Sequence, residues 1–287
     1  MTTLQPSSDW RAGESNNHYD QDPAFFATFL DRVHMKYSPG IFDGRERTLE
    51  EAQSAKLHYI AQSLGVQPGS RVLDVGCGWG SLSCFLASEY RCQVVSITPA
   101  RRQAEYVRRR AAELGAAGRV RIEVGHFPDE IAVPPRSFDA VAYVGSITHV
   151  HDKALALRRT FETLVTGGRV YISESCFRNV RMRHEFERRP GTQFVLRETF
   201  GFAELNPISD YVVALEDAGF SLTSLRDLTE EYRRTIEAWA ENARSNRDRL
   251  ERFAQGATDR LLRYFEVCNT GWGYTTKQYA LVASKSR

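Results

Sequence analysis

The sequence predicts an α/β fold in which a largely parallel sheet carries helices on both faces. Apolar, strand-like segments alternate with segments of helical spacing between residues 70 and 175. A glycine-rich segment follows the first of these strands and precedes a helix, at the edge where such sheets bind ligands. The length of 287 residues suits one large domain, or a domain with an insertion.

The first 65 residues are expected to form a helical cover. Residues 1–18 are polar, like a frayed arm, whereas residues 23–64 carry apolar residues at helical spacing. A turn-rich segment, residues 37–44, interrupts this pattern.

Residues 66–177 are expected to form the core. Apolar strands are predicted at 70–76, 93–98, 119–124, 138–144 and 169–175, and helices at 79–90, 100–115 and 152–165. Strands that alternate with helices of this length form parallel sheets.

The alternation ends after residue 177. Residues 178–212 are rich in Arg and Phe without a clear period, which favours an inserted cap over the carboxyl edge of the sheet. Residues 213–287 are expected to complete the sheet with strands at 220–228 and 275–284, separated by a long helix over 232–267. The predicted fold is therefore a seven-stranded mixed sheet with N-terminal helices and an inserted cap.

Composition excludes several kinds of function. A net charge of +2 argues against a dedicated nucleic-acid binder. Without a run of about 18 apolar residues or an apolar leader, we expect no membrane span or secretory signal, and a cytoplasmic protein. The five cysteines are scattered and include no CxxC pair, so neither a disulfide framework nor a zinc site is expected.

The glycine-rich segment points to a particular nucleotide. Asp74, Gly76, Gly78 and Gly80 form D-x-G-x-G-x-G between a strand and a helix. A dinucleotide site would have its third glycine one position later and an acidic residue about 20 residues on. The second strand instead ends at Thr98-Pro99, without an acid. The pattern resembles motif I of class I methyltransferases that use S-adenosylmethionine (SAM).

Further motifs narrow the resemblance. Over nearly the whole chain, from about residue 16, the sequence resembles the cyclopropane fatty acid and mycolic acid synthase family. The matching motifs are His18-Tyr19-Asp20, Tyr37-Ser38, Thr48 to Lys56, the glycine-rich segment, Thr98 with Gln103, Tyr232-x-x-Thr-x-x-x-Trp239 and Gly271-x-Gly-Tyr-x-x-x-Gln278.

This resemblance implies a set of SAM-binding residues. Gly76, Cys77, Gly78 and Trp79 would flank SAM after Asp74, and Gly145 would join them. Thr98 and Gln103 would hold the ribose in place of the usual acid. Tyr37 and Ser38 would close over the methionine end, with Tyr19 covering it. His126 and Phe127 stand where family members hold the adenine with Trp-Glu.

The sequence departs from the family where the ring closes. Cyclopropane synthases methylate an alkene, and a bicarbonate held by polar residues then removes a proton. The family's bicarbonate residues Cys, Glu and His are replaced here by Pro39, Thr148 and Ser173, and only Tyr232 matches. These replacements argue against ring closure to a cyclopropane.

The candidate catalytic residues are therefore His149, Tyr232, Glu174 and Thr148. His149 would be a general base, or alternatively a helix-capping or supporting residue. Glu174 is another possible base, with an ion pair to a nearby Arg as the alternative. His149-x-His151-Asp152 is a weak metal pattern, and no metal is expected. The Arg-rich run 178–197 favours a solvated face over an anion site. Aromatic residues of the cap could line the substrate site or be plain core; they are Phe177, Phe186, Phe194, Phe200, Phe202 and Tyr211.

Together these patterns predict SAM-dependent C-methylation of an alkene in a bulky apolar or prenylated natural product. Some bacterial members of the resembling family act in secondary metabolism, for example on the prenyl chain of an indole alkaloid of the teleocidin type, where the cation cyclises. The alternatives are an O- or N-methyltransferase, a methyltransferase of lipid acyl chains, or a SAM-binding cyclase without methyl transfer. The expected partner is a small hydrophobic substrate, and a homo-oligomer is possible.

Overall fold

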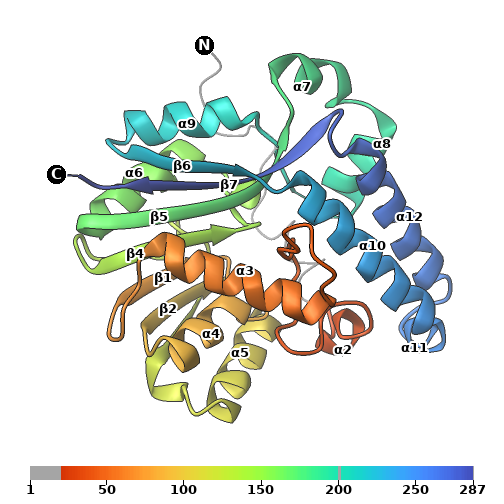
Figure 1. The fold of residues 1–287 in the computed structure, drawn as a ribbon, viewed down its shortest axis with the longest axis horizontal. Helices are drawn as coiled ribbons and strands as arrows, with labels where there is room; N and C mark the ends of the chain where they lie inside the picture. Colours follow the sequence, from red (N-terminus) through yellow and green to blue (C-terminus); the bar gives the residue numbers. More distant parts are fainter. Residues whose placement is uncertain (1–20, 200–201, 287) are drawn as a thin grey trace.

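A computed structural model describes residues 21–199 and 202–286 of the chain. These residues form a seven-stranded sheet in the order β3-β2-β1-β4-β5-β7-β6 (Figure 1). Strands β1 to β5 pair in parallel, and β7 runs antiparallel to both β5 and β6. The predicted seven-stranded mixed sheet is confirmed.

The elements of the core follow the predicted alternation within a few residues. They are β1 (Arg71–Val75), α4 (Ser81–Glu89), β2 (Gln93–Thr98), α5 (Arg101–Glu113), η1 (Ala117–Arg119), β3 (Val120–Val124), β4 (Phe138–Val144), η2 (Ile147–His149), α6 (Lys153–Thr163) and β5 (Leu164–Phe177).

The remaining elements lie before and after this core. They are α2 (Pro23–Phe26), α3 (Leu49–Leu64), α7 (Val180–Phe186), α8 (Pro190–Gln193), the π-helical η3 (Phe194–Thr199), α9 (Ile208–Asp217), β6 (Ser221–Asp227), α10 (Thr229–Ser245), α11 (Arg247–Glu251), α12 (Ala257–Gly271) and β7 (Thr276–Ser284).

Helices cover both faces of the central strands, as their continuous apolar sequences require, whereas the edge strand β6 is largely exposed. Because successive strand residues point to opposite faces, Val72 packs with α3 and α4, whereas Leu73 packs with α6 and α9. Helix α3 begins at a capping box in which Thr48 and Glu51 bond to each other's backbone N–H groups.

The N-terminal helix is much shorter than the apolar spacing predicts. It ends at Phe26, and the last apolar residue of the pattern, Val33, is 50% exposed. Side-chain amides from α10 and from the residue after it bond to the carbonyl groups just beyond α2: Asn242 donates to Phe29 O (3.0 Å) and Asn246 to Thr28 O (3.0 Å). These tertiary hydrogen bonds hold the segment in a turn.

The prediction of one long helix over 232–267 is wrong. The segment forms α10, α11 and α12, and α10 and α12 lie side by side (Figure 1). Gly256 stands at the start of α12 with φ +72°, a left-handed conformation that interrupts any continuous helix. The break lets rings from both helices meet the N-terminal segment, with Phe29 and Trp239 centred 5.7 and 6.0 Å from Phe265.

The cap contains more regular structure than its sequence indicates. Helix α8 lies against α12, since a Cβ on Gly191 would be 3.6 Å from Val267 Cγ1, whereas α7 contacts β5 (Figure 1). An ion pair ties the cap to the core, because Glu204 accepts from Lys153 Nζ at 2.9 Å; Arg183, also in the cap, donates to Glu204 at 3.2 Å. Among the described residues, none of the helices is long and apolar enough to cross a membrane.

Gly80 offers a test of how tightly α4 and α5 pack. Its φ is +72°, and an added Cβ would lie 2.6 Å from Val107 Cγ2. Gly115 has a similar φ of +64°, but an added Cβ there would meet nothing within 4 Å. Alanine therefore strains the backbone at both positions, whereas only at Gly80 does it also overpack the interior. We expect Gly80→Ala to lower the free energy of unfolding by about 1–3 kcal/mol more than Gly115→Ala in urea denaturation. Equal losses would contradict this packing.

Candidate active site

Two adjoining cavities lie at the carboxyl edge of the sheet. The small cavity has a volume of about 130 Å³, and the large cavity about 540 Å³. Both are lined by Tyr37, Gly145 and His149, so they meet at these three residues. This edge is where ligands bind in open α/β sheets.

The glycine-rich turn forms one wall of the small cavity. Gly76 and Gly78 have φ +73° and +55°, and the backbone N–H of Gly76 donates to Ile97 O at 2.9 Å. A Cβ on Gly78 would meet nothing within 4 Å, which leaves room for a ligand against the backbone. Most of the predicted cofactor residues line this cavity: Tyr37, Gly76, Cys77, Gly78, Trp79, Thr98, Gln103, His126, Phe127 and Gly145.

The other predicted cofactor residues lie elsewhere. Asp74 is buried behind the wall, where its carboxylate accepts from Ser83 Oγ at 2.5 Å and burial raises its pKa. Ser38 lines the large cavity, and its Oγ accepts from the Lys56 ammonium. Tyr19 lies outside the described residues.

A hydroxyl and an amide that bond to each other line the small cavity. Thr98 Oγ1 donates to Gln103 Oε1 at 2.7 Å, and both side chains are at least 96% buried. This bond fixes the amide so that the Gln103 Nε2 hydrogens remain as donors for a ligand. The pair therefore suits a ribose in a site that has no acidic residue at the end of β2.

All four predicted catalytic residues line the large cavity. They come from three places in the fold: Thr148 and His149 from η2, Glu174 from β5, and Tyr232 from α10. η2 and β5 lie side by side at the edge of the sheet. A hydrogen bond from the backbone N–H of Thr148 to Glu174 Oε2, at 3.2 Å, joins them.

His149 is held by the cap as a neutral imidazole. Its Nδ1 donates to the backbone O of Phe202 at 2.7 Å, which leaves the lone pair on Nε2. Burial lowers the pKa of His149 to about 4, helped by the Lys153 charge and opposed by the Phe202 carbonyl. Asp152, not His149, caps α6, and a role for His149 as a base stays a prediction.

Glu174 is a buried carboxyl held by backbone groups. It accepts from the N–H of Ser175 at 2.9 Å and from that of Thr148, so its partners are not the nearby Arg residues. Burial raises the pKa of Glu174 to about 7, against the effect of these hydrogen bonds. A carboxyl that titrates near neutral pH suits general-base chemistry.

Pro39, Thr148 and Ser173 are the residues that we expect in place of the family's bicarbonate ligands, and hydrogen bonds within the fold engage both hydroxyls. Pro39 and Thr148 line the large cavity, but the Thr148 hydroxyl donates to Glu204 O at 2.8 Å. Ser173 is 1% exposed and accepts from Gln278 Nε2 at 3.1 Å.

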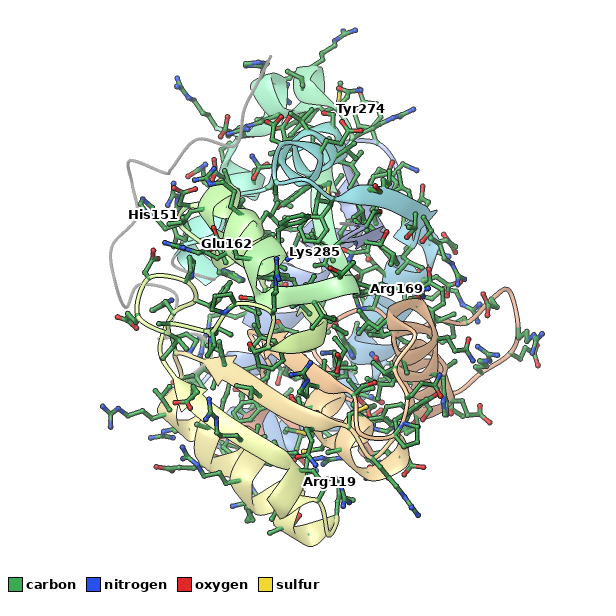
Figure 2. The ribbon with its side chains drawn as sticks, turned by 90° about the vertical axis from the view of Figure 1, so that its left-hand side faces the viewer. Arg119, His151, Glu162, Arg169, Tyr274 and Lys285 are labelled. Carbon is green, nitrogen blue, oxygen red and sulfur yellow. The ribbon has the colours of Figure 1, made fainter. Side chains whose placement is uncertain are left out.

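The aromatic lining comes mainly from α10, α12 and the turn after α12. Of the candidates from the cap, only Phe186 lines the large cavity; Phe177, Phe202 and Tyr211 are buried core, Phe194 packs against the helices, and Phe200 is outside the described residues. Sequence reasoning missed Tyr264, Trp272 and Tyr274, although the last two lie in the quoted Gly271-x-Gly-Tyr motif. Tyr274, 61% exposed, marks the rim at the end of the molecule opposite Arg119 (Figure 2).

The charged residues of the cap have mixed roles. Arg183 is committed to ion pairs, whereas Arg189 is exposed, lies over the ring of Phe186 and lines the large cavity.

The His149-x-His151-Asp152 segment shows no arrangement for a metal. Asp152 caps α6 by accepting from Leu155 N. In residues 21–199 and 202–286, no group of three His, Cys, Asp or Glu could hold a metal ion.

The strand order and the glycine-rich turn define a class I SAM-dependent methyltransferase. A family model described as mycolic acid cyclopropane synthetase matches residues 7–280, and the chain belongs to this family. The family uses SAM, and the small cavity fits it through the hydroxyl–amide pair and the open space at Gly78.

Known relatives differ in how much of their length the chain spans. The chain is 30% identical over 260 residues to a probable fatty acid methyltransferase of Pseudomonas putida, covering 90% of this chain but only 64% of that protein. It is 28% identical to the SAM-dependent methyltransferase UmaA of Mycobacterium tuberculosis, covering 87% of each. The solved cyclopropane synthase MmaA2 of M. tuberculosis has a TM-score of 0.87 at 25% identity and covers 97% of this chain and 100% of that chain.

The ribose assignment can be tested at Gln103. Gln103→Ala removes the amide that Thr98 orients, and losing such a hydrogen bond costs about 0.5–1.5 kcal/mol. We expect SAM affinity, measured by calorimetry, to fall by up to roughly tenfold. Gln62→Ala, on the exposed side of α3, is the matched control and should bind SAM like the parent chain. Unchanged affinity in Gln103→Ala would refute the assignment.

Proposed function

We propose that the chain catalyses SAM-dependent C-methylation of an alkene in a bulky apolar or prenylated natural product. The observation that carries this proposal is the large cavity, which opens onto the cofactor residues at Tyr37, Gly145 and His149. Its volume of about 540 Å³ falls in the usual range for sites that bind small molecules. Its aliphatic and aromatic lining favours an apolar acceptor.

The chain's own residues would position the alkene and protect the cation that forms on it. When bound, SAM supplies an electrophilic methyl group, so an electron-rich alkene needs placement more than activation. Tyr37 and His149 stand where the two cavities meet, and so would fix the distance between donor and acceptor. The rings of Tyr232 and Trp272, centred 4.9 Å apart, offer π faces to a cation in the large cavity.

Two groups in the large cavity could take a proton from that cation. Glu174 presents a carboxylate once deprotonated, and His149 presents the Nε2 lone pair. Because Pro39, Thr148 and Ser173 form no polar cage for bicarbonate, we expect the proton to be lost without ring closure to a cyclopropane. An acceptor with its own π nucleophile, such as the prenyl chain of an indole alkaloid of the teleocidin type, would instead cyclise.

A second candidate is methylation of a lipid acyl chain. It is favoured by the family and by the name of the P. putida relative. The same lining would accept an unsaturated chain, so the product decides between the two. O- or N-methylation has weaker support, because aliphatic and aromatic side chains make up much of the lining of the large cavity.

The product can be followed with ¹³C-methyl SAM and a panel of acceptors. The panel contains a prenylated indole, geranyl diphosphate and a monounsaturated phospholipid. We expect the label on carbon of a prenyl acceptor, as a methyl group or an exocyclic methylene in the product NMR spectrum. Cyclopropane methylene signals, or label on oxygen or nitrogen, would overturn the proposal, and turnover of the phospholipid alone would establish the second candidate.

The pH dependence identifies the base. If Glu174 accepts the proton, it must be ionised, and kcat/KM should fall as the pH drops below about 7. Glu174→Gln should lose this limb and slow turnover by about 10²–10⁴-fold. Glu216→Gln, on the exposed face of α9, should keep the parent profile. A limb near pH 4 that survives in Glu174→Gln and disappears in His149→Ala would assign the role to His149 instead.

A further inference from the structure

Lys36 is a buried cation in the small cavity that the sequence motifs do not include. The side chain lines this cavity and is 5% exposed. Its backbone N–H donates to Asp31 Oδ2 at 2.8 Å, which fixes the turn that carries it. Met35, just before it, adopts φ +54° and gives the turn its shape.

The position of Lys36 corresponds to one end of the bound cofactor. His126 and Phe127 line the part of the small cavity expected to hold the adenine, and Thr98 with Gln103 the part expected to hold the ribose. Lys36 stands next to Tyr37, which borders the large cavity where the methyl group must be transferred. The amino-acid end of SAM, with its carboxylate, is the part left for this region.

The Lys36 ammonium lacks a direct partner within the described part of the chain. It has no hydrogen bond or ion pair there, whereas the neighbouring Lys56 ammonium donates to Ser38 Oγ. Asp74 and Asp31 contribute negative charge nearby, but Asp74 accepts from Ser83, and Asp31 accepts from the backbone of His34 and Lys36. Burial lowers the pKa of Lys36, and the charge of Asp74 opposes this shift.

We propose that Lys36 binds the carboxylate of the methionine moiety of SAM. A buried ammonium without a partner is costly, and a carboxylate brought in by a ligand offsets that cost. The amino-acid group of the ligand carries an ammonium as well as the carboxylate, so this group adds no net charge beside Asp31, Asp74, Lys36 and Lys56, and the sulfonium of SAM brings one further positive charge. This role concerns cofactor binding and holds for any methyl acceptor.

The rival explanation is that Lys36 only balances the two buried aspartates. The two roles predict opposite effects on the ligand-free protein. If Lys36 is structural, Lys36→Met destabilises it. If Lys36 serves the ligand, Lys36→Met removes a desolvated charge, and the ligand-free protein keeps or gains thermal stability.

The test compares two ligands that differ only in the amino-acid part. S-adenosylhomocysteine carries the carboxylate, and 5′-methylthioadenosine lacks the whole amino-acid group. In calorimetry, Lys36→Met should lower the affinity for S-adenosylhomocysteine by about 10–100-fold, because hydrogen bonds to charged groups are stronger than those between neutral groups. The affinity for methylthioadenosine should change less than about twofold, and Lys36→Arg should recover part of the loss.

Two controls separate this role from general effects. Lys277→Met removes one positive charge from the pair with Asp227, away from both cavities, and should leave both affinities unchanged. Gln103→Ala should lower the affinity for both ligands by the same factor, because both contain the ribose. Equal weakening of the two ligands by Lys36→Met, no weakening, or a less stable ligand-free protein would overturn the proposal. Neither ligand requires an acceptor, so the result is independent of the proposed substrate.

Discussion

The close contact between the turns after β1 and β4 is the constraint on which the site depends. Val75 and Tyr143 pair in register, and both strands end within two residues of this pair. Gly76 and Gly145 then leave the sheet with φ +73° and +70°, and a Cβ on Gly76 would lie 2.4 Å from Ser146 Cβ. Ser146 Oγ donates to Val75 O at 2.6 Å and locks the two turns together. Any side chain at Gly76 would push apart the walls of both cavities.

The two cavities on either side of this contact differ in their electrostatics. The small cavity contains an ammonium and an oriented amide, groups that suit a zwitterionic nucleoside. The large cavity contains the His149 imidazole and the Glu174 carboxyl. Burial favours the uncharged form of both groups, with pKa values of about 4 and about 7. At neutral pH a cation generated there would meet an unprotonated His149 imidazole and a Glu174 carboxyl that is partly ionised.

The sequence predicted the parts of the structure that local pattern controls. The strands at 93–98 and 138–144 coincide with β2 and β4, and ten of the thirteen predicted cofactor residues line one cavity. It failed where tertiary contacts decide: Asn242 and Asn246 end α2 early, and Gly256 breaks the helix expected over 232–267. Ring placement was unpredictable for the same reason, since Tyr211 and Tyr264 look alike in sequence but only Tyr264 lines the large cavity. Lys36 belongs to none of the sequence motifs, so only its buried position in the small cavity identifies it as a candidate ligand-binding residue.

The distribution of the cap's contacts has an evolutionary consequence. Residues 178–199 and 202–207 contribute to the lining of the large cavity, and none of them lines the small cavity. The cap also enters and leaves the sheet between β5 and α9, without supplying a strand. Mutations, insertions or exchanges in this segment can therefore change which acceptor is admitted while SAM binding stays intact. The acceptor site of this chain can thus vary in the cap while its lining from α10 and α12 stays in place, provided that the backbone O of Phe202 still orients His149.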